Sequence, residues 1–168
     1  VGTTDDLTLE TVITDDALFD LGNIPDLDVL RLADGAFNLL RVQDLETLFG
    51  GTADDDVGVL SDVAGLFDLG SGFDTLDATG AGNFTIAQAV SIEQYDGSAG
   101  VDNVTLGSDL FAGSVYDGGA GADVLTLFGG SSNVAAIFDF EQIFGGAGNE
   151  NLTFENIVGG SPVEVDLG

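Results

Sequence analysis

The chain has 168 residues, 44% of them hydrophobic, so it is long and apolar enough to build one continuous core. Its 30 Asp and Glu face only two basic residues, a formal net charge of −28, which argues against nucleic acid and anionic membrane surfaces as partners; no apolar run is long enough for membrane insertion. The absence of Cys, His, Met and Trp removes disulfides, thiolate zinc sites and imidazole catalysis, and leaves oxygen-ligand metal chemistry.

Three sequence marks recur along the chain with a period of about 48 residues. The first is an apolar residue followed by Asp and a turn, the second an apolar residue followed by Glu, and the third an Asn that follows a small-residue turn. The aspartates step by 48, 49 and 49, the glutamates by 47 and 48, and the asparagines by 45 and 50. The marks are Asp20, Asp68, Asp117 and Asp166; Glu46, Glu93 and Glu141; and Asn38, Asn83 and Asn133.

From the N-terminus, residues 1–49 form a degenerate repeat, residues 50–155 match the pattern better, and residues 156–168 are a truncated repeat. Short β-branched or aliphatic runs end in Gly, Asp or Ser, which indicates short strands between turns. The stretches 37–49, 84–95 and 134–144 are either strand or helical turn, and the 26 glycines favour strand.

Short strands with regular turns predict stacked coils that cover one another. We therefore expect an all-β fold, a right-handed parallel β-solenoid (β-roll or β-helix) of about seven coils, two per repeat. Residues 1–168 would form a single domain, as a segment of a longer repetitive protein.

A glycine-rich motif recurs within the repeats. Residues 118–126 fit the nonapeptide G-G-x-G-x-D-x-U-x at every position, and near matches lie at 50–58, 69–77, 97–105 and 145–153. Glycine permits the tight turn, Asp supplies a charged oxygen and the aliphatic U faces the core. Over residues 50–155 the chain thus resembles the repeats-in-toxin family of calcium-binding β-roll proteins.

The resemblance implies that Ca²⁺ lies between the loops of neighbouring coils, held by the motif acid and by carbonyl groups of the glycine loop. An additional Asp six residues before the motif acid would complete the shell. The motif acids are spaced by 19, 28, 21 and 27 residues, which departs from the consecutive nonapeptides of the family and predicts larger coils. The implied metal residues are Asp55, Asp68, Gly70, Gly72, Asp74, Asp96, Gly97, Gly100, Asp102, Asp117, Gly118, Gly119, Gly121, Asp123, Gly145, Gly146, Gly148 and Glu150.

Each motif also has a plainer interpretation. The Asp-Gly turns are solvated turns without metal in the simplest view. The recurring glutamates are interpreted as positions of the solenoid wall, with a glycosidase carboxylate row as the alternative. Thr8, Thr105 and Thr153 are β-formers or an ice-binding ladder, and Phe19, Phe67 and Tyr116 are expected in stacked aromatic columns inside the solenoid.

The sequence therefore predicts a calcium-binding extracellular structural or surface-assembly module (an S-layer, fibre or adhesin part) whose folding is coupled to calcium, and no enzyme. It would associate end to end or belong to a longer parent chain, at a bacterial cell surface, exported without a cleaved N-terminal signal. The alternatives are a calcium-binding accessory domain of a secreted enzyme and a carbohydrate- or ice-binding adhesin segment.

Overall fold

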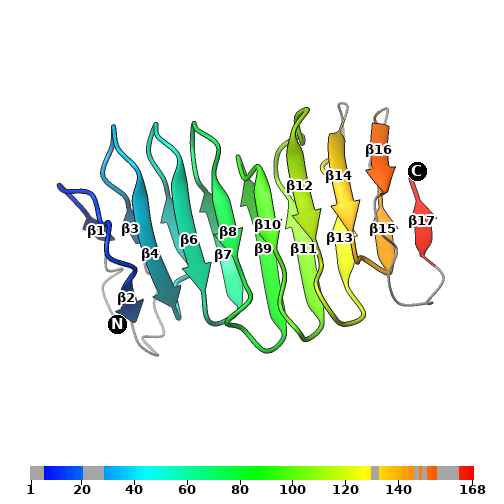
Figure 1. The fold of residues 1–168 in the computed structure, drawn as a ribbon, viewed down its shortest axis with the longest axis horizontal. Helices are drawn as coiled ribbons and strands as arrows, with labels where there is room; N and C mark the ends of the chain where they lie inside the picture. Colours follow the sequence, from blue (N-terminus) through cyan, green and yellow to red (C-terminus); the bar gives the residue numbers. More distant parts are fainter. Residues whose placement is uncertain (1–5, 21–28, 130–132, 146–147, 149–150, 155–162) are drawn as a thin grey trace.

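The computed structural model describes residues 6–20, 29–129, 133–145, 148, 151–154 and 163–168, apart from the side chains of Ala64, Thr153 and Phe154. These residues form 17 strands and no helix. All strand pairs among them are parallel, and the chain winds as a β-solenoid (Figure 1). The predicted fold class is confirmed, and the three stretches left open between strand and helical turn are strands.

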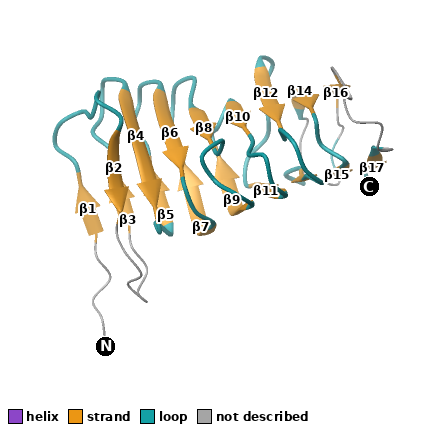
Figure 2. Cartoon of the chain, turned by 60° about the horizontal axis from the view of Figure 1, so that its bottom comes forward, coloured by secondary structure: helices purple, strands orange, loops and turns teal. Residues whose placement is uncertain are grey.

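The strands alternate between two sheets, so each turn contributes one strand to each (Figure 2). Sheet A has nine strands: β1 (Asp6–Thr8), β3 (Val29–Arg31), β5 (Thr47–Phe49), β7 (Val63–Asp68), β9 (Phe84–Val90), β11 (Asp102–Leu106), β13 (Val124–Thr126), β15 (Gln142–Phe144) and β17 (Glu164–Asp166). Sheet B has eight: β2 (Ala17–Asp20), β4 (Asn38–Gln43), β6 (Asp55–Val59), β8 (Thr75–Asp77), β10 (Gln94–Asp96), β12 (Ser114–Asp117), β14 (Val134–Phe138) and β16 (Asn151–Phe154).

Alternation of side chains along each strand builds the core between the sheets. Buried and outward-facing positions alternate in β6, β11 and β12, as expected for strands with one face on a core. Because the strands pair in register, buried residues stack into columns from coil to coil. The sheet B column is Leu40, Val57, Leu76, Tyr95, Tyr116 and Ile137, all at most 2% exposed.

The 48-residue repeat spans five strands, not the four strands that two coils per repeat would give. The recurring glutamates precede β5, β10 and β15, and the recurring apolar-Asp pairs end β2, β7, β12 and β17. Five strands make two and a half turns. Successive repeats therefore place equivalent residues on opposite sheets, and the prediction of two coils per repeat is wrong.

Two expectations based on the repeat change for the same reason. Thr8 and Thr105 lie in sheet A and Thr153 in sheet B, so the three do not form one ladder. Phe67 and Tyr116 are both buried, but in opposite sheets. The observed aromatic stack joins different repeat positions: the ring of Tyr95 lies 6.3 Å from Phe84 and 5.8 Å from Tyr116.

Candidate functional site: two buried carboxylate chains

The turns of the solenoid lie along two edges. Turns leading from sheet A to sheet B form the A-to-B edge, at the top of Figure 1, and turns leading from sheet B to sheet A form the B-to-A edge. The motif aspartates lie where these turns enter a strand. Four of them, Asp55, Asp74, Asp102 and Asp123, are at most 1% exposed.

The first carboxylate chain, Asp55, Asp74 and Glu93, lies on the A-to-B edge, at the starts of β6, β8 and β10. The main-chain N–H of Asp55 donates to Oδ1 of Asp74 at 2.7 Å. The N–H of Asp74 donates to Oε2 of Glu93 at 3.0 Å. Each carboxylate thus binds the main chain of the equivalent residue one coil earlier and links neighbouring coils.

The second carboxylate chain, Asp102, Asp123 and Glu141, repeats this arrangement on the B-to-A edge, at the starts of β11, β13 and β15. The N–H of Asp102 donates to Oδ1 of Asp123 at 2.8 Å, and the N–H of Asp123 donates to Oε2 of Glu141 at 2.7 Å. The change of edge follows directly from a repeat of two and a half turns.

The first member of each chain has donors for both oxygens. Oδ1 of Asp55 accepts from the main-chain N–H (3.0 Å) and Nδ2 (2.8 Å) of Asn38, and Oδ2 accepts from the N–H of Gly51 at 3.2 Å. Asp102 accepts from the N–H and the hydroxyl of Ser98, both at 2.6 Å, and from the hydroxyl of Tyr95 at 3.1 Å. These carboxylates are held by neutral donors alone.

The middle member of each chain is different. Oδ2 of Asp74 and Oδ2 of Asp123 are shielded from solvent and have no hydrogen-bond partner among the described residues. Burial, opposed by one main-chain hydrogen bond and reinforced by acidic neighbours, raises the pKa of each of these two carboxyls to about 7. A buried, charged oxygen without a donor is costly, so each site calls for a proton or a cation.

The motif glycines bring main-chain oxygens close to these acids. A Cβ on Gly121 would overlap the carbonyl oxygen of Gly100 in the preceding coil and would lie 2.7 Å from Oδ1 of Asp123. At the equivalent place in the first chain, Gly72 has φ +152°, and its Cβ would lie 2.8 Å from the carbonyl oxygen of Ala53. At both places only glycine can pack this closely against the main chain of the preceding coil.

The ligand types at these sites fit a hard cation, but the arrangement of the carboxylates does not. Carboxylate and carbonyl oxygens are the ligands that Ca²⁺ prefers, and an orphaned buried oxygen marks the centre of each site. The three carboxylates of a chain do not converge, however: the described part of the chain holds no group of three or more acidic side chains arranged to hold a metal ion. A cation would rely on one carboxylate and on main-chain carbonyls.

The additional aspartates predicted to complete the shell have other partners. Oδ1 of Asp68 accepts from the N–H of Gly70 at 3.2 Å, and Oδ1 of Asp117 accepts from the N–H of Gly119 at 2.9 Å, so both close the turn after their own strand. Asp96 accepts from the side-chain amide of Gln94 at 2.9 Å. Their role as ligands stays a prediction.

The remaining predicted glycines serve close packing where the structure describes them. A Cβ on Gly70, Gly97, Gly118 or Gly119 would overlap main-chain oxygens of an adjoining coil, and one on Gly145 would overlap the main chain of Leu167. Gly148 is half-buried. Gly146 and Glu150 lie outside the described residues.

Three members of the site were assigned differently from the sequence. Glu93 and Glu141, interpreted as wall positions, are the last carboxylates of the two chains, and Asn38 caps the first chain. The sequence did contain a signal for these assignments, because hydrogen-bonded residues of a chain are separated by the length of one coil. The separations are 17, 19 and 19 residues from Asn38 to Glu93 in the first chain. They are 21 and 18 residues in the second chain.

Searches against protein-family models, curated proteins and solved structures find no match to this chain. Over the part that the structure describes, no helix is long and apolar enough to cross a membrane.

Proposed function

We propose that this chain is a structural β-solenoid module whose stability is coupled to calcium bound at two sites, centred on Asp74 and Asp123. The observation that carries the proposal is the pair of orphaned buried oxygens, Oδ2 of each residue. They occupy equivalent positions in two repeats, so their recurrence is a feature of the repeat. A cation at each site would supply the missing positive partner.

Calcium suits these sites better than other ions do. The site offers oxygen atoms only, and the chain has no His or Cys with which to select a transition metal. With a net charge of −28 the folded chain repels itself, and divalent cations reduce that repulsion. Sites with one carboxylate and several carbonyls suit the weak, millimolar affinities of extracellular calcium modules.

The resemblance of the motif to repeats-in-toxin proteins supports the same setting. We place the module outside the cell, at a bacterial surface, as part of an S-layer, fibre or adhesin. In this role the solenoid acts through its length and its surfaces. Calcium from the medium would stabilise the turns of both edges once the chain has left the cell, because ion binding to the folded state alone adds to folding stability.

The test compares the variants Asp74→Asn and Asp123→Asn with the control variant Glu46→Gln. Glu46 is one of the three recurring glutamates and is not assigned to either carboxylate chain. We expect calorimetry on the chelator-treated protein to show two calcium ions, one lost in each Asp→Asn variant and none in Glu46→Gln. Without calcium the Asn variants should melt at higher temperature than the parent, because the amide is neutral and Asn38 already occupies the same column. A parent protein whose calorimetry and melting do not respond to millimolar calcium would contradict the proposal.

A further inference from the structure

The exposed aromatic side chains gather on one edge of the solenoid. Among the described residues, the large apolar side chains exposed on the B-to-A edge are limited to Val101, at 39%. The A-to-B edge carries five phenylalanines in or next to its turns. They are Phe37 (46% exposed), Phe73 (46%), Phe111 (63%), Phe128 (39%) and Phe144 (36%).

Two of these rings stand in one column with a carboxylate between them. The register pairs Asn38 with Asp55 and Asp56 with Thr75, so Phe37, Asp54 and Phe73 follow one another on three neighbouring coils. Oδ1 of Asp54 accepts from the N–H of Phe73 at 2.8 Å. With strands about 4.8 Å apart, the two phenylalanines lie roughly 9.6 Å apart along the solenoid axis.

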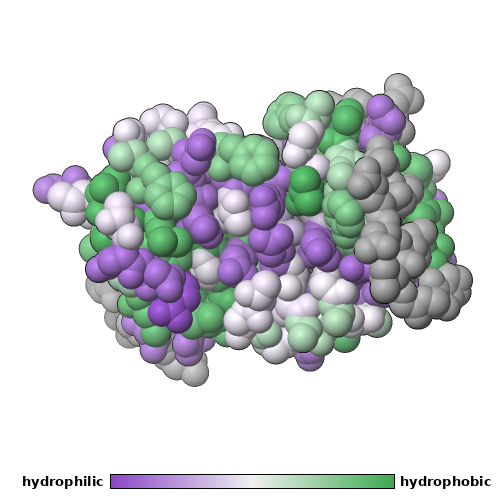
Figure 3. Space-filling view, in the orientation of Figure 1, coloured by the Kyte–Doolittle hydropathy of each residue, from purple (hydrophilic) through white to green (hydrophobic). Residues whose placement is uncertain are grey.

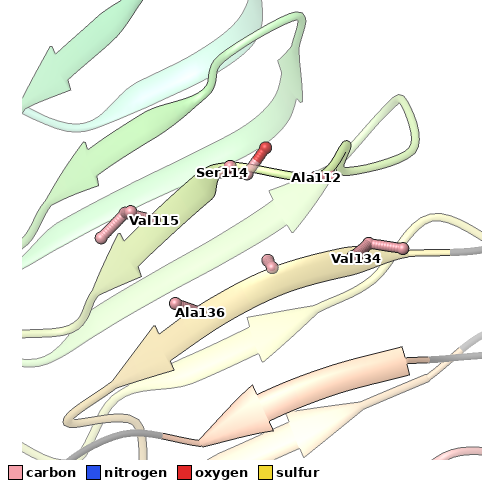
Figure 4. A pocket seen from close by; sticks show the side chains of 7 residues that line it. Ala112, Ser114, Val115, Val134 and Ala136 are labelled. Atoms are coloured by element: carbon pink, nitrogen blue, oxygen red, sulfur yellow. The ribbon is translucent and has the colours of Figure 1, made fainter.

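A shallow hollow continues this edge beyond Phe111. It has a volume of about 260 Å³ and lies between the beginnings of β12 and β14. Its lining consists of small residues, among them Gly113, Val115, Val134 and Ala136 (Figure 4). Along the top of the molecule in Figure 3, apolar residues lie among hydrophilic ones. None of the described residues that line the hollow is charged, and the hollow has room for a compact apolar side chain.

The charge of the edge restricts what binds there. Asp34, Asp54 and Asp109 lie in its turns. The two basic residues of the chain are both paired with acidic residues. Arg31, at the end of β3, is bridged to Asp6 at 3.5 Å and covers the ring of Phe49. Arg41, in β4, is bridged at 3.0 Å to Asp16 in an A-to-B turn. A second copy of this acidic chain or an anionic lipid surface would be repelled, whereas a basic segment would be attracted.

We propose that the A-to-B edge docks an extended, basic, proline-rich segment of another protein in the polyproline II conformation. Such a segment has three residues per turn and rises ~3.1 Å per residue, so it presents the same face every ~9.3 Å. This repeat matches the two-coil separation of Phe37 and Phe73; alternate residues of a β-strand, at roughly 6.7 Å, do not. Exposed aromatic rings contact the prolines, as in other polyproline-binding surfaces, and the intervening carboxylates pair with Lys or Arg.

The probe is a synthetic Pro-Pro-Lys repeat peptide of about a dozen residues, measured by fluorescence anisotropy on the calcium-supplemented protein at roughly 0.15 M salt. We expect saturable binding that Phe37→Ser and Phe73→Ser each weaken by roughly fivefold or more. Val101→Ser on the opposite edge is the matched control and should bind like the parent. All three side chains are exposed, and a melting curve for each variant confirms the fold.

The remaining comparisons decide the occupant. A Gly-Ser-Lys peptide of equal charge should bind at least roughly tenfold more weakly, because a flexible chain loses more conformational entropy. Equal binding of the two peptides, or unchanged binding in both phenylalanine variants, would reduce the effect to nonspecific charge attraction and overturn the proposal. Displacement of the peptide by a neutral linear oligosaccharide would also overturn it and assign the edge to glycans. Because the experiment does not use the carboxylate chains, its outcome is separate from that of the calcium test.

Discussion

The two carboxylate chains have the same geometry although their sequences match the nonapeptide motif to different degrees. Asp123, the middle acid of the second chain, belongs to the complete motif, whereas the motif around Asp74 has Leu69 in place of its first glycine. Both acids accept one main-chain hydrogen bond from the preceding coil, and both leave Oδ2 without a partner. The glycine two residues before the acid is common to both chains, and the first glycine is replaceable.

The chains differ at their first acid. In the first chain Asp55 is held by the amide of Asn38, and in the second chain Asp102 is held by the hydroxyls of Ser98 and Tyr95. The first acid of each chain is thus held by hydrogen-bond donors, but the chemical groups that donate differ between the two chains. Substitution of a residue that serves both chains in the same way should have a large and equal effect in each chain. Substitution of a donor that occurs in one chain should have a smaller effect, confined to that chain.

The largest effect is expected from the shared glycine. Gly72→Ala and Gly121→Ala should each destabilise the protein by more than about 4 kcal/mol, because the new Cβ meets main-chain atoms of the preceding coil that have little room to move. Urea unfolding with circular dichroism measures the loss. Gly82→Ala is the control: no atom lies within 4 Å of its Cβ position, so its stability should stay within about 0.5 kcal/mol of the parent. Equal effects in all three variants would show that coil packing does not depend on these glycines.

The sequence predicted the parallel solenoid because strand length, turn chemistry and a fixed period all reflect backbone constraints that recur in every repeat. It did not predict the half-turn in each repeat, because the marks at Glu46 and Glu93 carry no information about which sheet they enter. It also placed Glu93 and Glu141 in the wall. A carboxylate reaches a main-chain N–H of the preceding coil only through the register of the coils, and that register is a property of the folded stack.

The second prediction concerns pH, and again involves both chains equally. The pKa of Asp74 and of Asp123 is raised to about 7 in the folded protein, so the folded state binds these protons more tightly than the unfolded state does. This contribution to stability is fully present below about pH 4 and is lost as the pH rises through about 7. In chelator, unfolding should therefore be harder at pH 5 than at pH 8, by on the order of 2 kcal/mol for each carboxylate.

The general repulsion among acidic groups has the same sign, so the control is the double variant Asp74→Asn/Asp123→Asn. It keeps the general repulsion and removes the two titrating groups, and its pH dependence should be weaker by the contribution of both. Added calcium should reduce the loss at pH 8 in the parent, because the ion binds the charged form. If the double variant and the parent have the same pH profile, the two acids do not titrate in this range.

The smallest effect should separate the chains. Tyr95→Phe removes one donor from Oδ2 of Asp102, which keeps the N–H of Ser98, so we expect a loss of roughly 1 to 2 kcal/mol. Burial raises the pKa of Tyr95 well above its usual range, so its hydroxyl remains a donor as the pH rises.

The matched control is Tyr116→Phe. The hydroxyl of Tyr116 donates to the main-chain oxygen of Ile92 at 2.8 Å. Its loss should be similar in size, because each substitution removes one hydroxyl donor from a buried acceptor. The loss in Tyr95→Phe should be local to the second chain. Hydrogen exchange should place it near Ser98 and leave the turn at Gly51 unchanged, since the first chain has Leu48 at the equivalent position and needs no hydroxyl there. Faster exchange at both turns would mean that the two chains are coupled through the core.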